Sequence, residues 1–274
     1  MKQIILHTGN KALEQRFTTD SFNQMQYEQV AYRELQLWQR KMSRKPSIGD
    51  RISKSIQVRM NKIIPEKIHK VITTTIKQMV RGVLFGASLA LPKGKKGSSL
   101  REMENQVRKR VEFYRNTAAA EGGLTGAGGI LLGLADFPLL LTLKIKMLFD
   151  IAALYDIDVN DYKERLYILH IFQLAFSSQQ HRRDVYQQIQ HWEERAKELP
   201  NDIHAFDWRN FQQEYRDYID LAKLAQLIPG IGAVVGVVVN YRLINKLGDT
   251  AMNAYRMRMF GIPRQRSNPD SNRD

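Results

Sequence analysis

Residues 118–135 read AAAEGGLTGAGGILLGLA, and glycines recur at four-residue intervals in this stretch and in other apolar parts of the chain. Glycine costs about 1 kcal/mol relative to alanine in a helix interior, so this stretch would not hold a helix alone in water. A four-residue spacing places glycines on one helix face, where two backbones can approach closely. We therefore predict close-packed, glycine-rich helical hairpins, with packing positions at Gly122, Gly126, Gly129, Gly133, Gly232 and Gly236.

Helical periodicity extends over most of the remaining chain. No strand-like alternation bounded by hairpin turns occurs, although residues 234–239 have the composition of a buried strand as well as of a helix. The predicted fold is all-α, a single helical domain with basic amphipathic helices in its N-terminal part. The predicted helices cover about residues 20–42, 50–64, 65–91, 99–114, 138–155 and 161–177, with another after Asn240. Two of them begin with a capping pattern, Ser99 with Glu102 and Asp161 with Glu164.

Domain boundaries follow from the composition. We expect an N-terminal helical arm at residues 1–45, the helical domain at 46–262 and a disordered basic tail at 263–274. The first ten residues are too polar for a signal peptide, which makes a cytoplasmic location the expectation. The absence of cysteine excludes disulfides, thiolate nucleophiles and cysteine-ligated metals.

The positive charge is concentrated in one segment. Residues 40–96 hold 15 Lys and Arg and two acidic residues, a net +13 in a chain of net +14. Such a segment predicts a polyanionic partner, nucleic acid or anionic lipid, unless the basic faces are merely solvated. Nucleic-acid surfaces usually interleave aromatic side chains, and Phe85 is the only aromatic residue in this segment, so anionic lipid is favoured and nucleic acid disfavoured. The candidate anion-binding residues are Arg51, Lys54, Lys62, Lys67, Lys70, Lys93, Lys95 and Lys96.

Two apolar runs raise the question of membrane insertion. A spanning helix needs about 20 apolar residues. Residues 224–239 are shorter and contain Gln226 and Pro229, and residues 122–143 carry Asp136 in the middle. Neither run is a convincing span, so hairpins resting on or dipping into a bilayer and a soluble bundle with tight crossings remain alternatives.

Two polar residues within or beside these runs are candidates for either a functional or a structural role. Asp136 precedes Phe137-Pro138, so it could be a helix N-cap or a carboxylate of raised pKa in a site. We favour the cap. Asn240 could likewise be a buried amide bonded to a neighbouring helix end or a cap of its own helix.

Recognisable catalytic chemistry is missing from the sequence. None of the six histidines forms HExxH, and neither GxSxG nor a GxxxxGK[ST] phosphate loop occurs. His170 on an apolar helix reads as a core residue. We therefore predict no catalytic residue, no metal and no cofactor. Enzymatic activity is left open, but the sequence disfavours it.

Several blocks of the sequence resemble the EcsC family. They are YEQVAYRELQLWQRKM from Tyr27, the segment from Ile56 to Ser88, AAAEGGLTGAGGILLGLADFP from Ala118, and IPGIGAVVGVVVNYRLINKLGDTAMNAYR from Ile228. The resemblance covers about residues 25–260 and implies peripheral membrane association, with subunits of an ABC transporter, the Ecs transporter, as the partner. It implies no reaction and no catalytic residue.

Three functional hypotheses remain. The first is a non-enzymatic helical protein that docks on the inner face of the membrane and supports or modulates a membrane complex. The second is a hydrolase acting on lipid or peptide with a dispersed site near Asp136, and the third is a nucleic-acid binder. The sequence favours the first.

Overall fold

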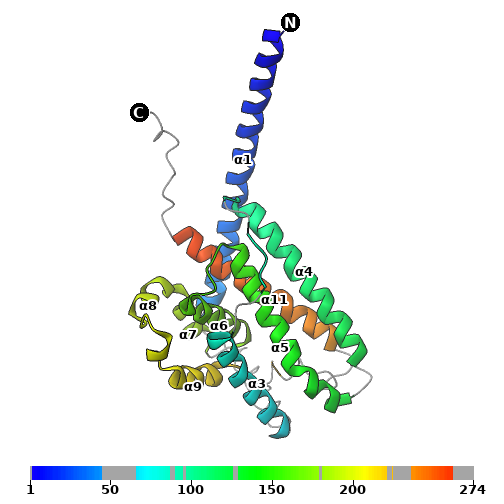
Figure 1. The fold of residues 1–274 in the computed structure, drawn as a ribbon, viewed down its shortest axis with the longest axis vertical. Coiled ribbons are helices and arrows are strands. Elements are labelled where there is room, and N and C mark those ends of the chain that lie inside the picture. Colours follow the sequence, from blue (N-terminus) through cyan, green and yellow to red (C-terminus); the bar gives the residue numbers. More distant parts are fainter. Residues whose placement is uncertain are drawn as a thin grey trace.

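The computed structural model describes residues 2–44, 66–86, 90–94, 97–125, 129–178, 181–220, 224 and 236–261. It describes the backbone alone for residues 2–19, 69, 118–125, 129–136 and 236–239. The helices, labelled as in Figure 1, are α1 (Lys2–Ser43), α3 (Glu66–Phe85), α4 (Leu100–Thr125), α5 (Gly129–Leu154), α6 (Tyr162–Phe176), α7 (Arg182–Gln190), α8 (Trp192–Glu198), the 3₁₀ turn η2 (Ile203–Ala205), α9 (Trp208–Tyr218) and α11 (Gly236–Gly261). Across these ranges there is no strand, only an isolated antiparallel bridge between Ser177 and Ile219, so the all-α prediction is confirmed.

Three long helices, α4, α5 and α11, pack against one another at the centre of the molecule (Figure 1). Helix α6 packs on α11 and α5, and α7 packs on α6 and α1. Helix α3 contacts α5, α6 and α9. The second half of α1 lies on α11, α7 and α4, whereas its first half extends away from the body of the protein.

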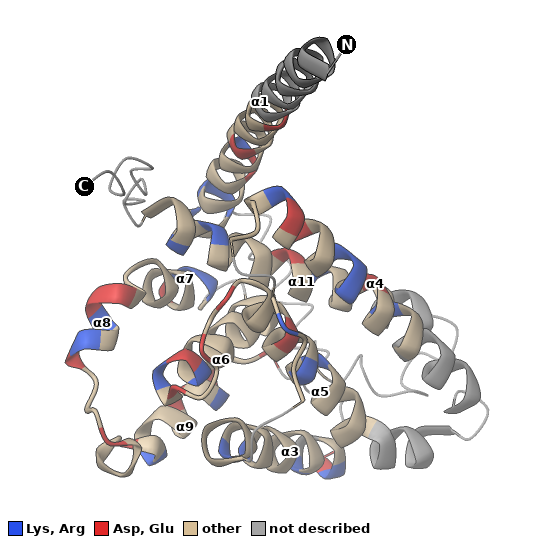
Figure 2. Cartoon of the chain, turned by 45° about the horizontal axis from the view of Figure 1, so that its top comes forward, with Lys and Arg blue, Asp and Glu red and all other residues tan. Residues whose placement is uncertain are grey.

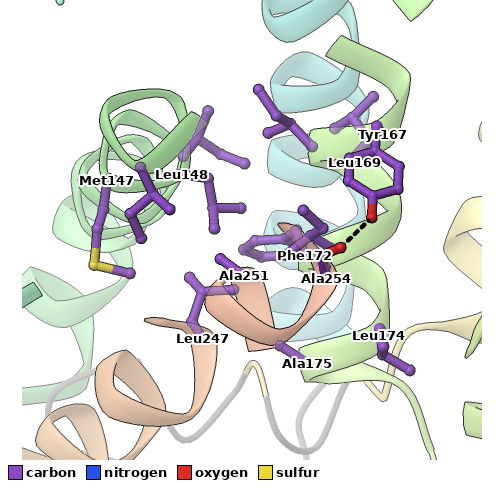
Figure 3. Close-up of a cluster of buried hydrophobic side chains, with 14 of the residues drawn as sticks. Met147, Leu148, Tyr167, Leu169, Phe172, Leu174, Ala175, Leu247, Ala251 and Ala254 are labelled. Atoms are coloured by element: carbon purple, nitrogen blue, oxygen red, sulfur yellow. Dashed lines mark hydrogen bonds between the residues drawn. The ribbon is translucent and has the colours of Figure 1, made fainter. Parts of the chain in front are cut away.

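The hydrophobic core lies where α5, α6 and α11 meet (Figure 3). Met147, Phe172 and Ala251 are fully buried there, and the Tyr167 hydroxyl donates a hydrogen bond of 2.8 Å to the Ala254 carbonyl. Small residues on α11 let the larger side chains of α6 approach closely, so the core is filled by interlocking large and small side chains. Helix α6 is buried almost all round, which explains its run of apolar residues.

The predicted capping patterns are confirmed in part. The Ser99 hydroxyl accepts from the Glu102 amide, and the Glu102 carboxylate accepts from the Ser99 amide at 2.9 Å, a reciprocal capping box at the start of α4. The Asp161 side chain caps α6 by accepting from the Lys163 amide. The expected role of Glu164 in that cap is wrong, because its carboxylate accepts from Arg258 instead.

Helix boundaries differ from the prediction at several places, among them the end of α4 at Thr125 and the start of α11 at Gly236. Helix α1 begins before residue 20, α3 ends at Phe85 and not near Leu91, and α5 begins at Gly129 and not at Pro138. At the end of α3, the Arg165 guanidinium donates to the Val83, Leu84 and Gly86 carbonyls and so satisfies groups that continued helix would have used. No local pattern could reveal this, because Arg165 is about 80 residues away.

Helix α5 ends as expected near residue 155, and the structure shows how. The Ile157 amide donates to Ala152 and the Asp156 amide to Ala153, with Asp156 at φ 61°. This is the hydrogen-bond pattern of a Schellman motif, with aspartate in place of the usual glycine at the left-handed position.

The structure tests the prediction of close-packed glycine-rich helices only in part. Gly122 lies in α4, Gly129 and Gly133 lie in α5, and Gly236 is the first residue of α11, so these four are helical, whereas Gly126 and Gly232 lie outside the described residues. Helices α4 and α5 do form a hairpin (Figure 1). Close packing at the six glycines stays a prediction.

A close helix crossing occurs instead at Gly248, where α11 packs on α4. A Cβ atom added at Gly248 would lie 2.7 Å from a methyl group of Val111, closer than any real contact. Sequence reasoning missed Gly248 because it has no glycine four residues away.

Several predictions fall on residues that the structure does not describe. These are the helix at 50–64, the boundary at 45/46, the tail at 263–274 and residues 225–235 of the run at 224–239. Among the described helices, none has the length and hydropathy needed to span a bilayer.

Candidate functional site

The basic residues of α3 form one outward-facing row. Lys67, Lys70, Lys77 and Arg81 are spaced by three, seven and four residues, which places them on one side of the helix, and all four are exposed. Thr74 lies on the same side of the helix, between Lys70 and Lys77. We call these four side chains the basic row; it extends over about 20 Å along the helix axis.

The opposite side of α3 is buried in the protein. Ile68, Ile72, Ile76 and Val80 are each at most 2% exposed, packed toward α5, α6 and α9. The predicted amphipathic helix is therefore present, but its apolar face is already occupied by the protein's own core. The basic row lies on the exposed side of α3, and Figure 2 shows α3 along one edge of the molecule with basic segments on it.

Of the other predicted anion-binding residues, the structure describes only Lys93. Lys93 is exposed in the connection between α3 and α4. Arg51, Lys54, Lys62, Lys95 and Lys96 lie outside the described residues. Lys77 and Arg81 were absent from the predicted set, although the same helical spacing from Lys67 and Lys70 identifies them.

Asn240 bonds to a buried lysine. Its side chain is 6% exposed, and its carbonyl oxygen accepts a hydrogen bond of 2.9 Å from the Nζ of Lys144, which is 2% exposed. The Lys144 amine also donates to the Leu140 carbonyl. The expectation of a buried amide is confirmed, but its partner is a side chain in the middle of α5, so Asn240 neither caps its own helix nor bonds to a helix end.

Asp136 is not a helix N-cap. Helix α5 begins at Gly129 and continues through Asp136 and Pro138, so the backbone at Asp136 is already helical. The prediction failed because a proline usually marks a helix start, whereas here the packing of α5 on α4 and α11 offsets the hydrogen bond that Pro138 cannot donate. The hypothesis that Asp136 belongs to a dispersed hydrolytic site stays untested.

A buried ion pair that the sequence did not predict joins α4 to α11. Arg256 donates from Nε and Nη2 to the two carboxylate oxygens of Glu104, both at 2.6 Å. The Glu104 side chain is fully buried, and the Tyr27 hydroxyl of α1 donates to it at 2.6 Å. Burial, reinforced by this hydrogen bond, raises the pKa of Tyr27 to about 12. Because Arg256 also reaches Glu34 of α1, the cluster attaches α1 to the central helices.

A second buried carboxylate, Asp150 on α5, is surrounded by donors. It accepts from the Nε of Arg110 and the hydroxyl of Tyr114, each at 2.7 Å, and pairs with Lys146. Burial and the bond to Asp150 raise the pKa of the Tyr114 hydroxyl. Both carboxylates are fully engaged by cations and hydroxyls, which fits a structural role.

His170 is a core residue, as predicted. It lies against the rings of Trp192 and Phe211, its Nδ1 is 3.2 Å from the Gln173 amide oxygen, and burial lowers its pKa to about 4. In the part of the chain that the structure describes, no three His, Cys, Asp or Glu side chains gather as metal ligands would.

The comparisons with known proteins place the chain in a family. The EcsC protein family model matches residues 29–260, so the chain belongs to the EcsC protein family. Protein EcsC of Bacillus subtilis (strain 168) is 44% identical over 233 residues, covering 85% of this chain and 96% of that protein. An uncharacterized protein of the same organism, YdbA, is 33% identical over 145 residues, about half of each chain. No solved structure matches.

Proposed function

We propose that this EcsC family protein is a non-enzymatic protein that binds peripherally to the cytoplasmic face of the membrane through anionic lipid. The basic row of α3 is the observation that carries the proposal. Its four cations stand on the exposed side of a helix whose opposite, apolar side packs in the core, so the core holds the cations at the surface. Binding through this row is therefore electrostatic and does not require α3 to leave the core.

The magnitude of such binding follows from the number of cations. A lysine or arginine near an anionic membrane surface contributes about 1 kcal/mol, so four of them give about 4 kcal/mol, a factor of about a thousand. Such an interaction is reversible and falls steeply with salt, because the Debye length is only about 8 Å at physiological ionic strength. A protein held in this way exchanges between solution and membrane.

At the membrane, the protein supports or modulates a membrane complex. The resemblance to the EcsC family points to the Ecs ABC transporter as that complex. Two features support a binding role over catalysis: the buried carboxylates Glu104 and Asp150 are both engaged in ion pairs, and His170 is neutral and enclosed by aromatic rings.

A matched pair of double variants tests the membrane role. Lys70→Gln with Lys77→Gln removes two cations from the basic row, and Arg101→Gln with Lys109→Gln removes two exposed cations from α4. We expect the α3 variant to bind phosphatidylglycerol vesicles about 30-fold more weakly, whereas the α4 variant should lose only a fewfold. Neutral phosphatidylcholine vesicles should bind neither parent nor variant.

Two results would reject the proposal. Equal losses in both double variants would mean that only net charge matters and that the basic row is not a site. Salt-sensitive binding of the parent to duplex DNA, with no binding to anionic vesicles, would assign the positive charge to nucleic acid instead.

A further inference from the structure

A groove of about 750 Å³ runs between α3 and α5. Its walls are apolar: Met79 and Val83 come from α3, Leu141, Ile145 and Phe149 from α5, and Leu91 from the connection after α3. This volume lies in the range of about 300–1,000 Å³ that is typical of small-molecule sites, which are mostly apolar with a few convergent polar groups.

The charged groups that line this groove are cations. Lys146 and Arg165 are the two ionisable residues among its lining residues within the described part of the chain, and no carboxylate is among them. Arg165 donates to the neutral carbonyls of Leu84 and Gly86, at 3.3 and 3.1 Å, and forms no ion pair with a carboxylate of the described residues. Lys146 pairs with Asp150, but that carboxylate is fully buried and is shared with Arg110. The groove is therefore apolar along its walls and positive beside them.

A glycine keeps the groove open. Gly82 lies within α3 and lines the groove, and a Cβ atom added there would meet no atom of the described residues within 4 Å. Glycine weakens a helix interior relative to alanine, and packing does not require it at this position. Gly86 differs, because a Cβ atom there would collide with the Gly82 carbonyl oxygen. The backbone path thus explains Gly86, whereas a side chain at Gly82 would extend into the open space beside the groove.

We propose that this groove binds one acyl chain of an anionic membrane lipid. The chain lies between α3 and α5 against the apolar walls, and the anionic headgroup lies beside Lys146 and Arg165. An apolar groove with positive charge and no negative charge complements a molecule with a long apolar tail and one anionic head. That the ligand comes from the membrane rests on the proposed function. That the groove binds a single acyl chain does not depend on it.

A chain-length series tests the groove directly. Delipidated full-length protein is titrated by calorimetry with lysophosphatidylglycerols of 8 to 16 carbons, each below its critical micelle concentration. Each methylene buried should strengthen binding about fourfold until the groove is full, after which affinity should level off. We expect one lipid per protein. Affinity that rises without levelling, or binding of many molecules per protein, would indicate surface adsorption and overturn the proposal.

The role of the cations is tested with headgroups. Lysophosphatidylcholine of the same chain length has no net charge and should bind at least tenfold more weakly than lysophosphatidylglycerol. Equal affinities would reject the assignment of the headgroup to Lys146 and Arg165. Binding of free fatty acids, with none of lysophosphatidylglycerol, would show that the ligand is not a membrane lipid.

A matched pair of glycine variants tests the location. Gly82→Leu fills the groove, and Gly261→Leu makes the same change at the last residue of α11, where an added Cβ atom also meets nothing within 4 Å. Gly82→Leu should weaken lysophosphatidylglycerol binding at least tenfold without lowering Tm, and Gly261→Leu should bind like the parent. Unchanged binding by Gly82→Leu would reject this groove, and a marked fall in its Tm would show that the protein's own chain occupies the space.

The same variants separate the two proposals. Gly82→Leu should still sediment with phosphatidylglycerol vesicles, because the basic row is intact. The Lys70→Gln, Lys77→Gln variant should lose vesicle binding and still bind a single lysophosphatidylglycerol. If the parent protein does not bind vesicles but still binds one lysophosphatidylglycerol, the membrane role is rejected and the lipid-binding groove is not.

Discussion

Replacing Glu104 with glutamine should destabilise the protein strongly. The substitution keeps the shape of the side chain but removes the charge that faces Arg256, whose side chain is 3% exposed. Removing one partner of a buried ion pair costs about 3–5 kcal/mol. The remaining partner of Arg256, Glu34, has a side chain that is half exposed and so offsets the charge only in part. For a chain of this size about 1 kcal/mol corresponds to 2–4 °C, so Tm should fall by about 6–20 °C.

Two further variants test this reasoning. Arg108 lies 3.5 Å from Glu104, but its side chain is half exposed, so Arg108→Gln should cost less than about 1 kcal/mol. The double variant Glu104→Leu, Arg256→Met replaces the whole pair with apolar groups and should be more stable than Glu104→Gln. The assay is thermal and urea denaturation followed by far-UV circular dichroism. A Tm for Glu104→Gln within 2 °C of the parent would refute the burial of this pair.

Three further predictions concern other buried groups. Gly248→Leu should destabilise the fold by about 1–3 kcal/mol in urea denaturation, because any side chain there collides with Val111; an unchanged midpoint would contradict the close crossing. The folded pKa of His170 is about 4 and the unfolded value about 6.5, so the unfolded state binds more protons and stability falls as pH drops through this window, by about 3 kcal/mol in all. His170→Phe should remove that loss between pH 6.5 and 4, and an identical pH profile would disprove the assignment. Asn240→Ala should cost about 1.5–3 kcal/mol by removing an acceptor of the buried Lys144 amine, and the combination Lys144→Met, Asn240→Leu should recover part of it in the same denaturation assay.

The sequence by itself determined the helical class, the reciprocal cap of Ser99 and Glu102, the cap at Asp161 and the two-sided character of α3. These features depend on residues within about one or two helical turns of each other, so the pattern of side chains and the geometry of the helix are sufficient. The basic row could be read in the same way, because a spacing of three or four residues fixes which side chains share a face.

Only the tertiary structure decided which polar groups meet. Glu104 and Arg256 are 152 residues apart, and Lys144 and Asn240 are 96 apart, so their pairing depends on how α4, α5 and α11 pack. The same packing carries α5 through Asp136 and Pro138, against the local preference for a helix start there. It also buries the apolar face of α3 and leaves the groove beside Gly82, because the space between two helices is set by all the side chains that hold them apart and not by either sequence alone.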